Sequence, residues 1–144
     1  MTAPTWFKSL EWSDPIRVED LREKRSLLPR KSGVYVFTNY SANLEQNFGV
    51  LYVGRAGSLF QRVQSYLSDP SKVRIFSKTS EKSEINTSLN HAGKVQLLMK
   101  IQQGMHSTPY SGIWVRWHTT GSPHLLEAQL ISYLRPAYNT AGLS

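Results

Sequence analysis

The sequence predicts a small α/β domain of the α+β kind, in which helices flank a central three-stranded antiparallel sheet. Residues 33–38 and 49–55 are rich in β-branched and aromatic side chains, and the polar loop between them favours an antiparallel hairpin. Residues 112–118 have the alternating character of a third strand. Apolar residues recur at helical spacing after residue 58 and after residue 123, which predicts two of the flanking helices.

These two helices carry recognisable start and stop signals. Ser58 and Gln61 have the spacing of a capping box, in which each residue satisfies a free backbone N–H of the first turn. Ser122, followed by a proline, is suited to cap the last helix, and Pro136 is expected to end it. The helix starts are therefore expected next to residues 58 and 122.

The remaining segments are less regular. We expect a short helix over residues 18–28, stopped by Pro29, and another over residues 95–104. Residues 68–91 are polar and rich in Ser, Lys and Asn, which is typical of a surface excursion.

Length and composition favour one globular domain. The chain has 144 residues and is 40% hydrophobic, enough to form a core and too apolar for a disordered polymer. It contains no cysteine, so disulfides and thiol catalysis are excluded. The apolar runs are too short to span a bilayer and no secretion signal is evident, so we expect a cytoplasmic protein without membrane contact.

The net charge of +7 is unevenly distributed along the chain. Residues 1–45 contain seven Lys/Arg and six Asp/Glu, whereas residues 46–144 contain ten and four. Such a surplus favours a polyanionic partner through phosphate contacts and counterion release, although many basic proteins bind nucleic acid only incidentally.

Glu127 interrupts the apolar face of the last predicted helix. At 100° per residue it falls between Leu134 and Ile131 on an otherwise apolar arc. An ionised carboxylate buried without a partner costs several kcal/mol, so Glu127 should be paired, protonated or bound to a cation. A salt bridge to an arginine, or exposure at the helix edge, is the structural alternative to a metal site.

Candidate catalytic groups occur in a fixed order along the chain. Gly33-Val34-Tyr35 is followed by Tyr52-Val53-Gly54, then by Arg62, Glu127 and Asn139. Together these residue types suit phosphodiester hydrolysis, because a phenol can position or deprotonate water, a cation can stabilise phosphoryl charge, and a carboxylate can hold a divalent metal. Each has a simpler interpretation as well: the tyrosines as strand packing and Arg62 as a surface arginine.

The ordered set resembles the GIY-YIG nuclease superfamily, and among its members the N-terminal nuclease module of bacterial excinuclease C. Residues 51–66 are similar to that module's segment around its second tripeptide, and residues 126–139 to its glutamate-to-asparagine segment. The resemblance covers about residues 30–140 of a single domain over 1–144, with residues 1–29 as an N-terminal extension. One departure is Arg55, where the module typically has lysine.

The resemblance implies a DNA endonuclease that leaves 5′-phosphate and 3′-hydroxyl ends. In this interpretation Glu127 holds one Mg²⁺ or Mn²⁺, Arg62 neutralises charge at phosphorus, and Tyr35 and Tyr52 activate water and bind phosphate, with Tyr35 as the base. We expect these groups to gather over one face of the sheet.

Further residues are assigned to substrate binding. Arg55 is expected to contact phosphate, Tyr66 to brace Arg62 or the scissile phosphate, and Gly54 to let the backbone approach substrate. Asn139 is expected to fix the chain after the last helix or to hydrogen-bond near the site. His124, one turn before Glu127, is a further metal-ligand candidate, with a solvated side chain as the alternative.

Other classes of function stay open on sequence alone. Lys72, Arg74, Lys78 and Lys82 could follow a nucleic-acid backbone, and Tyr110, Trp114 and Trp117 could stack on bases, or they could be a solvated loop and buried strand aromatics. The nuclease could act alone or rely on another protein for targeting. The alternatives to it are a non-catalytic DNA-binding module of the same fold, a restriction-type endonuclease and a protein-interaction adaptor.

Overall fold

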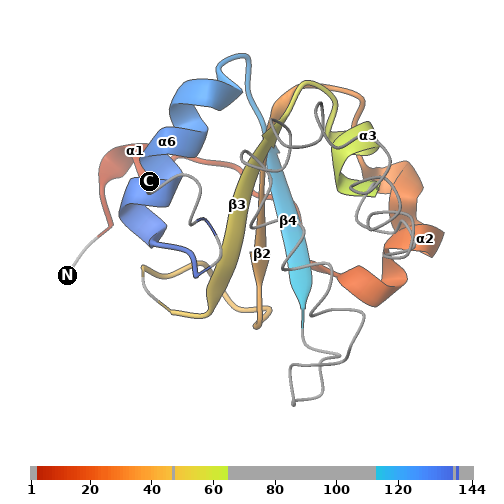
Figure 1. Ribbon diagram of the computed structural model, residues 1–144, viewed down its shortest axis with the longest axis horizontal. Helices are drawn as coiled ribbons and strands as arrows, with labels where there is room; N and C mark the ends of the chain where they lie inside the picture. Colours follow the sequence, from red (N-terminus) through yellow and green to blue (C-terminus); the bar gives the residue numbers. More distant parts are fainter. Residues whose placement is uncertain (1–2, 47, 65–112, 138, 140–144) are drawn as a thin grey trace, which may run out of the picture.

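The computed structural model describes residues 3–46, 48–64, 113–137 and 139, and it has helices on both sides of one sheet (Figure 1). Over these residues, no helix is long and apolar enough to cross a membrane. The helix expected over 95–104 and the polar excursion over 68–91 lie outside the described residues. The elements are, in chain order, α1 (Thr5–Lys8), β1 (Ile16–Arg17), a 3₁₀ turn (Val18–Asp20), α2 (Leu21–Lys24), a second 3₁₀ turn (Arg25–Leu27), β2 (Gly33–Thr38), β3 (Val50–Ala56), α3 (Leu59–Gln64), β4 (Trp114–Thr119) and α6 (Pro123–Leu134).

The expected hairpin is confirmed. β2 and β3 pair antiparallel, with Tyr35 opposite Gly54 and Val34 opposite Arg55. β2 also pairs antiparallel with β4, so it is the inner strand of the three predicted from sequence. β3 lies at one edge of the sheet, whose strand order is β1-β4-β2-β3.

The sheet has four strands instead of the three expected. β1 is only two residues long, Ile16 and Arg17, so it cannot display the alternation that reveals a strand in sequence. It pairs antiparallel with β4, opposite Val115 and Trp114. The backbone N–H of Val18 donates to the Ile113 carbonyl oxygen at 2.8 Å, which continues the pairing beyond the strand.

The short helix expected over residues 18–28 is only partly present. The segment forms one α-helical turn, α2, between two 3₁₀ turns, and its first residue, Val18, is hydrogen-bonded to the chain just before β4. The apolar residues that suggested the helix, Val18, Leu21 and Leu28, are nevertheless all buried in the core.

The sheet separates two hydrophobic cores (Figure 1). On one face, Tyr35, Phe37 and Tyr52 pack with α2 and with Leu59 and Val63 of α3. On the other face, the core consists of sheet valines, Leu44 and α6, with Val34, Val36, Val50, Val53, Leu126, Leu130 and Leu134 as its other buried members. Side chains of successive strand residues therefore point into different cores, as strand geometry requires.

The start of α6 agrees with the sequence, although its cap does not. The helix begins at Pro123 as expected, but Ser122 makes no side-chain capping hydrogen bond. The helix ends at Leu134, and Arg135 adopts a left-handed conformation with φ of 52°, which turns the chain before Pro136. By contrast, Ser58 does accept a hydrogen bond from the Gln61 backbone N–H, at 3.4 Å.

Candidate active site

The two candidate tyrosines lie on one face of the β2–β3 hairpin. Tyr35 is on β2 and Tyr52 is on β3, and their ring centroids are 6.3 Å apart at a tilt of 39°. Tyr35 is only 1% exposed, and Tyr52 is buried as well. The ring of Phe37 packs edge-on against Tyr35, with centroids 5.8 Å apart. The phenol rings are therefore fixed in orientation by their packing.

Gly54 allows the Tyr35 ring to cross the neighbouring strand. Tyr35 and Gly54 are directly opposite each other, and a Cβ atom added to Gly54 would lie 2.3 Å from Cζ and 2.4 Å from the hydroxyl oxygen of Tyr35. Because real Cβ atoms do not make such contacts, only glycine fits this position in the observed arrangement. The hydroxyl of Tyr35 thereby reaches the backbone of the edge strand β3.

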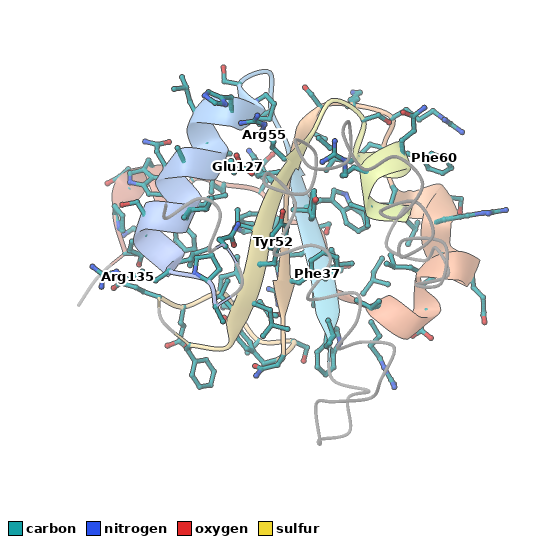
Figure 2. All side chains as sticks on the ribbon, in the orientation of Figure 1. Phe37, Tyr52, Arg55, Phe60, Glu127 and Arg135 are labelled. Atoms are coloured by element: carbon teal, nitrogen blue, oxygen red, sulfur yellow. The ribbon has the colours of Figure 1, made fainter. Side chains whose placement is uncertain are left out.

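Arg55 and Glu127 form an ion pair on the other face of the sheet. Arg55 follows Gly54, so its side chain points to the α6 side, where its Nη1 lies 3.2 Å from Oε1 of Glu127. Figure 2 shows both side chains together at the N-terminal part of α6. Arg55 also hydrogen-bonds Nδ1 of His124, one turn earlier on the helix. The side chain of Arg55 is 48% exposed and that of Glu127 is 20% exposed.

Burial dominates the electrostatics of Glu127. Its partial burial raises the pKa of the carboxyl group above the ordinary value, although Arg55, His124 and Arg62 each act in the opposite direction. The ion pair expected as one alternative for this acid is therefore present, yet it does not offset the loss of hydration fully. A second cation near Glu127 would be favoured by this environment.

Arg62 connects the two sides of the sheet. It is a half-buried residue of α3, which packs on the tyrosine face, and yet its charge acts on the pKa of Glu127 on the α6 face. Both faces meet at β3 because β3 is an edge strand. The candidate groups thus surround the edge of the sheet at Gly54 and Arg55. The expectation that they gather over one face is wrong, because strand alternation sends neighbouring residues to opposite sides.

Asn139 attaches the chain after α6 to the same strand. Its buried side-chain amide accepts a hydrogen bond from the backbone N–H of Val53 and donates one to the carbonyl oxygen of Val53, each at 2.8 Å. The Ala137 N–H donates to the Val50 carbonyl oxygen at 3.0 Å. These bonds pair the outer edge of β3 immediately beside Gly54. Asn139 therefore fixes the chain after the last helix, which is one of the two roles expected for it.

Of the other candidates, Trp117 lies beside Tyr35, its partner in the β2–β4 pairing, and several are outside the described residues. Tyr66, Tyr110 and the four basic residues expected to follow a nucleic-acid backbone (Lys72, Arg74, Lys78, Lys82) are outside the described residues. Trp117 is buried in the core of the tyrosine face, and Trp114 is half-buried on β4. The contact of His124 with Arg55 was not foreseen, although its spacing of three residues from Glu127 placed it on the same side of the helix.

Within the described residues, no group of three or more His, Cys, Asp or Glu side chains could hold a metal ion. Of the candidate site residues that the structure describes, Glu127 is the carboxylate that a divalent cation could bind. Mg²⁺ accepts such a site, since it is usually bound through one or two carboxylates while keeping several waters.

Comparison with known proteins supports the resemblance. No family model matches the chain. UvrABC system protein C from Limosilactobacillus reuteri is 30% identical over 107 residues, which is 74% of this chain and 17% of that protein. The same protein from Bdellovibrio bacteriovorus is 28% identical over 123 residues, 85% of this chain and 15% of the relative. This chain is similar to UvrC, as its motifs indicated.

The similarity to UvrC extends to a solved structure. The GIY-YIG N-terminal endonuclease domain of UvrC from Thermotoga maritima, bound to magnesium, is 25% identical, with a TM-score of 0.47. The match covers 84% of this chain and 97% of that domain. The chain corresponds to about one sixth of the length of the UvrC proteins it matches.

Proposed function

We propose that the protein is a divalent-metal-dependent endonuclease that hydrolyses DNA phosphodiester bonds and leaves 5′-phosphate and 3′-hydroxyl ends. The observation that carries this proposal is the convergence of a phenol, guanidinium groups and a carboxylate around Gly54 and Arg55 of β3, the last strand of the sheet. These are the groups that in-line attack of water on phosphorus needs.

Glu127 is the proposed ligand of one Mg²⁺ or Mn²⁺. Its carboxylate is a hard oxygen donor, and its burial leaves it with a raised pKa despite the neighbouring cations, so a divalent ion would be a favourable partner. When bound, the ion would stabilise negative charge on a phosphate oxygen. Water would supply the remaining ligands.

The side chains of this chain would perform the other tasks. The Tyr35 hydroxyl, held over Gly54, is proposed to orient the attacking water and to accept its proton, with Tyr52 beside it in contact with phosphate. The guanidinium of Arg62 is proposed to stabilise the charge that develops at phosphorus. The half-exposed guanidinium of Arg55 is proposed to bind a flanking phosphate.

Plasmid nicking tests this proposal directly. Purified protein should convert supercoiled DNA to open circles with Mg²⁺ or Mn²⁺ and should be inactive with a chelator. End-labelling of the products should show 5′-phosphate and 3′-hydroxyl groups. Absence of cleavage with either metal, on supercoiled, single-stranded and branched DNA, would refute the nuclease proposal.

A non-catalytic DNA-binding module is the second candidate, and one observation favours it. Glu127 already forms an ion pair with Arg55 through Oε1, so the proposed metal ligand has a cationic partner without any metal. In that case the protein would bind DNA and would not cut it with any metal. The relatives are named as proteins of a UvrABC system, and we include a targeting protein partner in either proposal.

A further inference from the structure

A basic segment lies at the N-terminal boundary of the residues that carry the resemblance to UvrC. Residues 24–31 contain Lys24, Arg25, Arg30 and Lys31 and no acidic residue. All four side chains are exposed. The net charge of residues 1–45 is small, because six acids offset seven Lys/Arg, but all six acids lie outside residues 24–31. We refer to these eight residues as the basic segment.

The basic segment is fixed to the helix that carries Arg62. The first turn of α3 donates two hydrogen bonds to it, from the Leu59 N–H to the Lys31 carbonyl oxygen at 2.9 Å and from the Phe60 N–H to the Pro29 carbonyl oxygen at 3.0 Å. The Arg30 guanidinium carbon lies 3.9 Å from the centroid of the Phe60 ring. The backbone from Pro29 to Lys31, which bears two of the four cations, is therefore held against α3 before any ligand binds.

Its position places it next to the candidate active site. β2 begins at Gly33, two residues after Lys31, and carries Tyr35, while α3 carries Arg62. Figure 1 shows α2 and α3 side by side on the face of the sheet opposite α6. A strand whose scissile phosphate is at the β3 edge can thus extend over α3 toward the basic segment.

We propose that the basic segment is a binding surface for the nucleic-acid backbone, which it contacts at phosphates flanking the one that is cleaved. This inference rests on the proposed function and specifies how its substrate is held. Four exposed cations without an intervening acid match the repeating charge of a phosphate backbone. Arg30 covers one face of the Phe60 ring, the aromatic ring next to these cations. Because contacts to phosphate carry no sequence information, the interaction should be independent of base sequence.

The test compares two double variants with equal loss of charge. Arg25→Gln/Lys31→Gln removes two cations from the basic segment. Lys8→Gln/Arg135→Gln removes two exposed cations from α1 and from the C-terminal end of α6, on the other side of the sheet. Fluorescence anisotropy with labelled single-stranded and duplex oligonucleotides, in chelator so that nothing is cut, gives the affinity as a function of salt concentration. Thermal unfolding verifies that both variants are folded.

The basic-segment variant should bind about tenfold more weakly or worse near 0.1 M salt, and the slope of log affinity against log salt should fall by about 0.7 to 0.9 for each phosphate that the variant no longer neutralises. The control variant should retain the wild-type slope. Equal weakening of the two variants would overturn the inference, as would a change confined to oligonucleotides of one base sequence.

Failure of this inference and failure of the proposed function are distinguishable. If the wild type binds DNA with the expected slope but never cleaves it, the binding surface stands and the nuclease proposal falls. If the wild type cleaves DNA and the basic-segment variant shows unchanged KM, kcat and salt slope, the nuclease proposal stands and the binding surface is wrong.

Discussion

The ring of Tyr35 crosses the edge strand at Gly54, where a single added methyl group would lie 2.3 Å from Cζ of the ring. The two residues belong to the two tripeptides that suggested a nuclease, and they are direct partners in the β2–β3 pairing. The glycine of the second tripeptide therefore determines where the tyrosine of the first one points. This packing explains why a glycine and a tyrosine occur together without either of them needing to touch substrate.

Replacement of Gly54 by alanine should move the Tyr35 ring. Overpacking of this kind costs about 1–3 kcal/mol of unfolding free energy. The displaced hydroxyl should lower DNA cleavage about a hundredfold, because misplaced reacting groups reduce the rate by that much. Gly57→Ala is the matched control, since a Cβ atom there meets nothing within 4 Å. Chemical denaturation and a cleavage assay on both variants measure the two effects, and equal behaviour of the pair would contradict the packing argument.

Tyr35→Phe should remove the proposed proton acceptor and leave the ring in place. We expect cleavage to fall by about 10²–10⁴-fold, the range typical of general acid–base groups, while DNA affinity is retained. Tyr133→Phe is the control, because that ring packs against Phe7 with centroids 4.9 Å apart, on the α6 side of the sheet. Single-turnover cleavage separates the chemical step from binding. Full activity of Tyr35→Phe would exclude this hydroxyl as the base.

Glu127→Gln should stabilise the fold at neutral pH. Burial raises the pKa of Glu127, so the folded protein binds this proton more readily than the unfolded chain does. The ionised carboxylate consequently lowers stability above its folded pKa, and this cost disappears as the pH falls below the unfolded value of about 4.3. The variant should melt a few degrees higher at pH 7, and the difference should vanish in acid.

An exposed acid supplies the control for this pH dependence. Glu45→Gln removes the same charge from a residue in the loop between β2 and β3 and should leave the melting temperature nearly unchanged at each pH. A Glu127→Gln variant that melts lower than the wild type at pH 7 would mean that the ion pair with Arg55 outweighs the cost of burial.

Asn139→Ala should loosen the outer edge of β3. The substitution leaves the backbone N–H and the carbonyl oxygen of Val53 without their two buried hydrogen bonds. Buried groups left in this state cost about 1–3 kcal/mol, which thermal or chemical unfolding detects readily. Asn43→Ala, at an exposed position, should have no such effect. Equal stability of the two variants would show that Asn139 does not hold the strand.

The sequence was informative where a local pattern has one structural meaning. β2 and β3 are dense in β-branched residues, and the first strand falls on its predicted bounds while the second differs by one residue at each end. The acid at position 127 was conspicuous because apolar residues flank it on both sides of the helical wheel. Pairing of this acid with an arginine was one of the stated alternatives, and the ion pair with Arg55 is what the structure contains.

The parts that could not be predicted depend on contacts between distant segments. β1 exists because β4 offers an edge to it, and no two-residue pattern reveals that. The position of the site around an edge, with the tyrosines on one side and Glu127 on the other, follows from the strand order, which the sequence does not specify. The steric reason for Gly54 likewise required the register that places Tyr35 opposite it.

Cleavage of labelled DNA by wild type and by Glu127→Ala in Mg²⁺ tests most directly whether the groups at the β3 edge form a metal-dependent nuclease site. Glu45→Ala serves as the control for loss of one acid, and anisotropy in chelator measures binding by all three proteins. We expect the wild type and Glu45→Ala to cut, and Glu127→Ala to bind DNA without cutting it. Undiminished cleavage by Glu127→Ala would contradict the assignment of this carboxylate, and with it the site around Gly54 and Arg55.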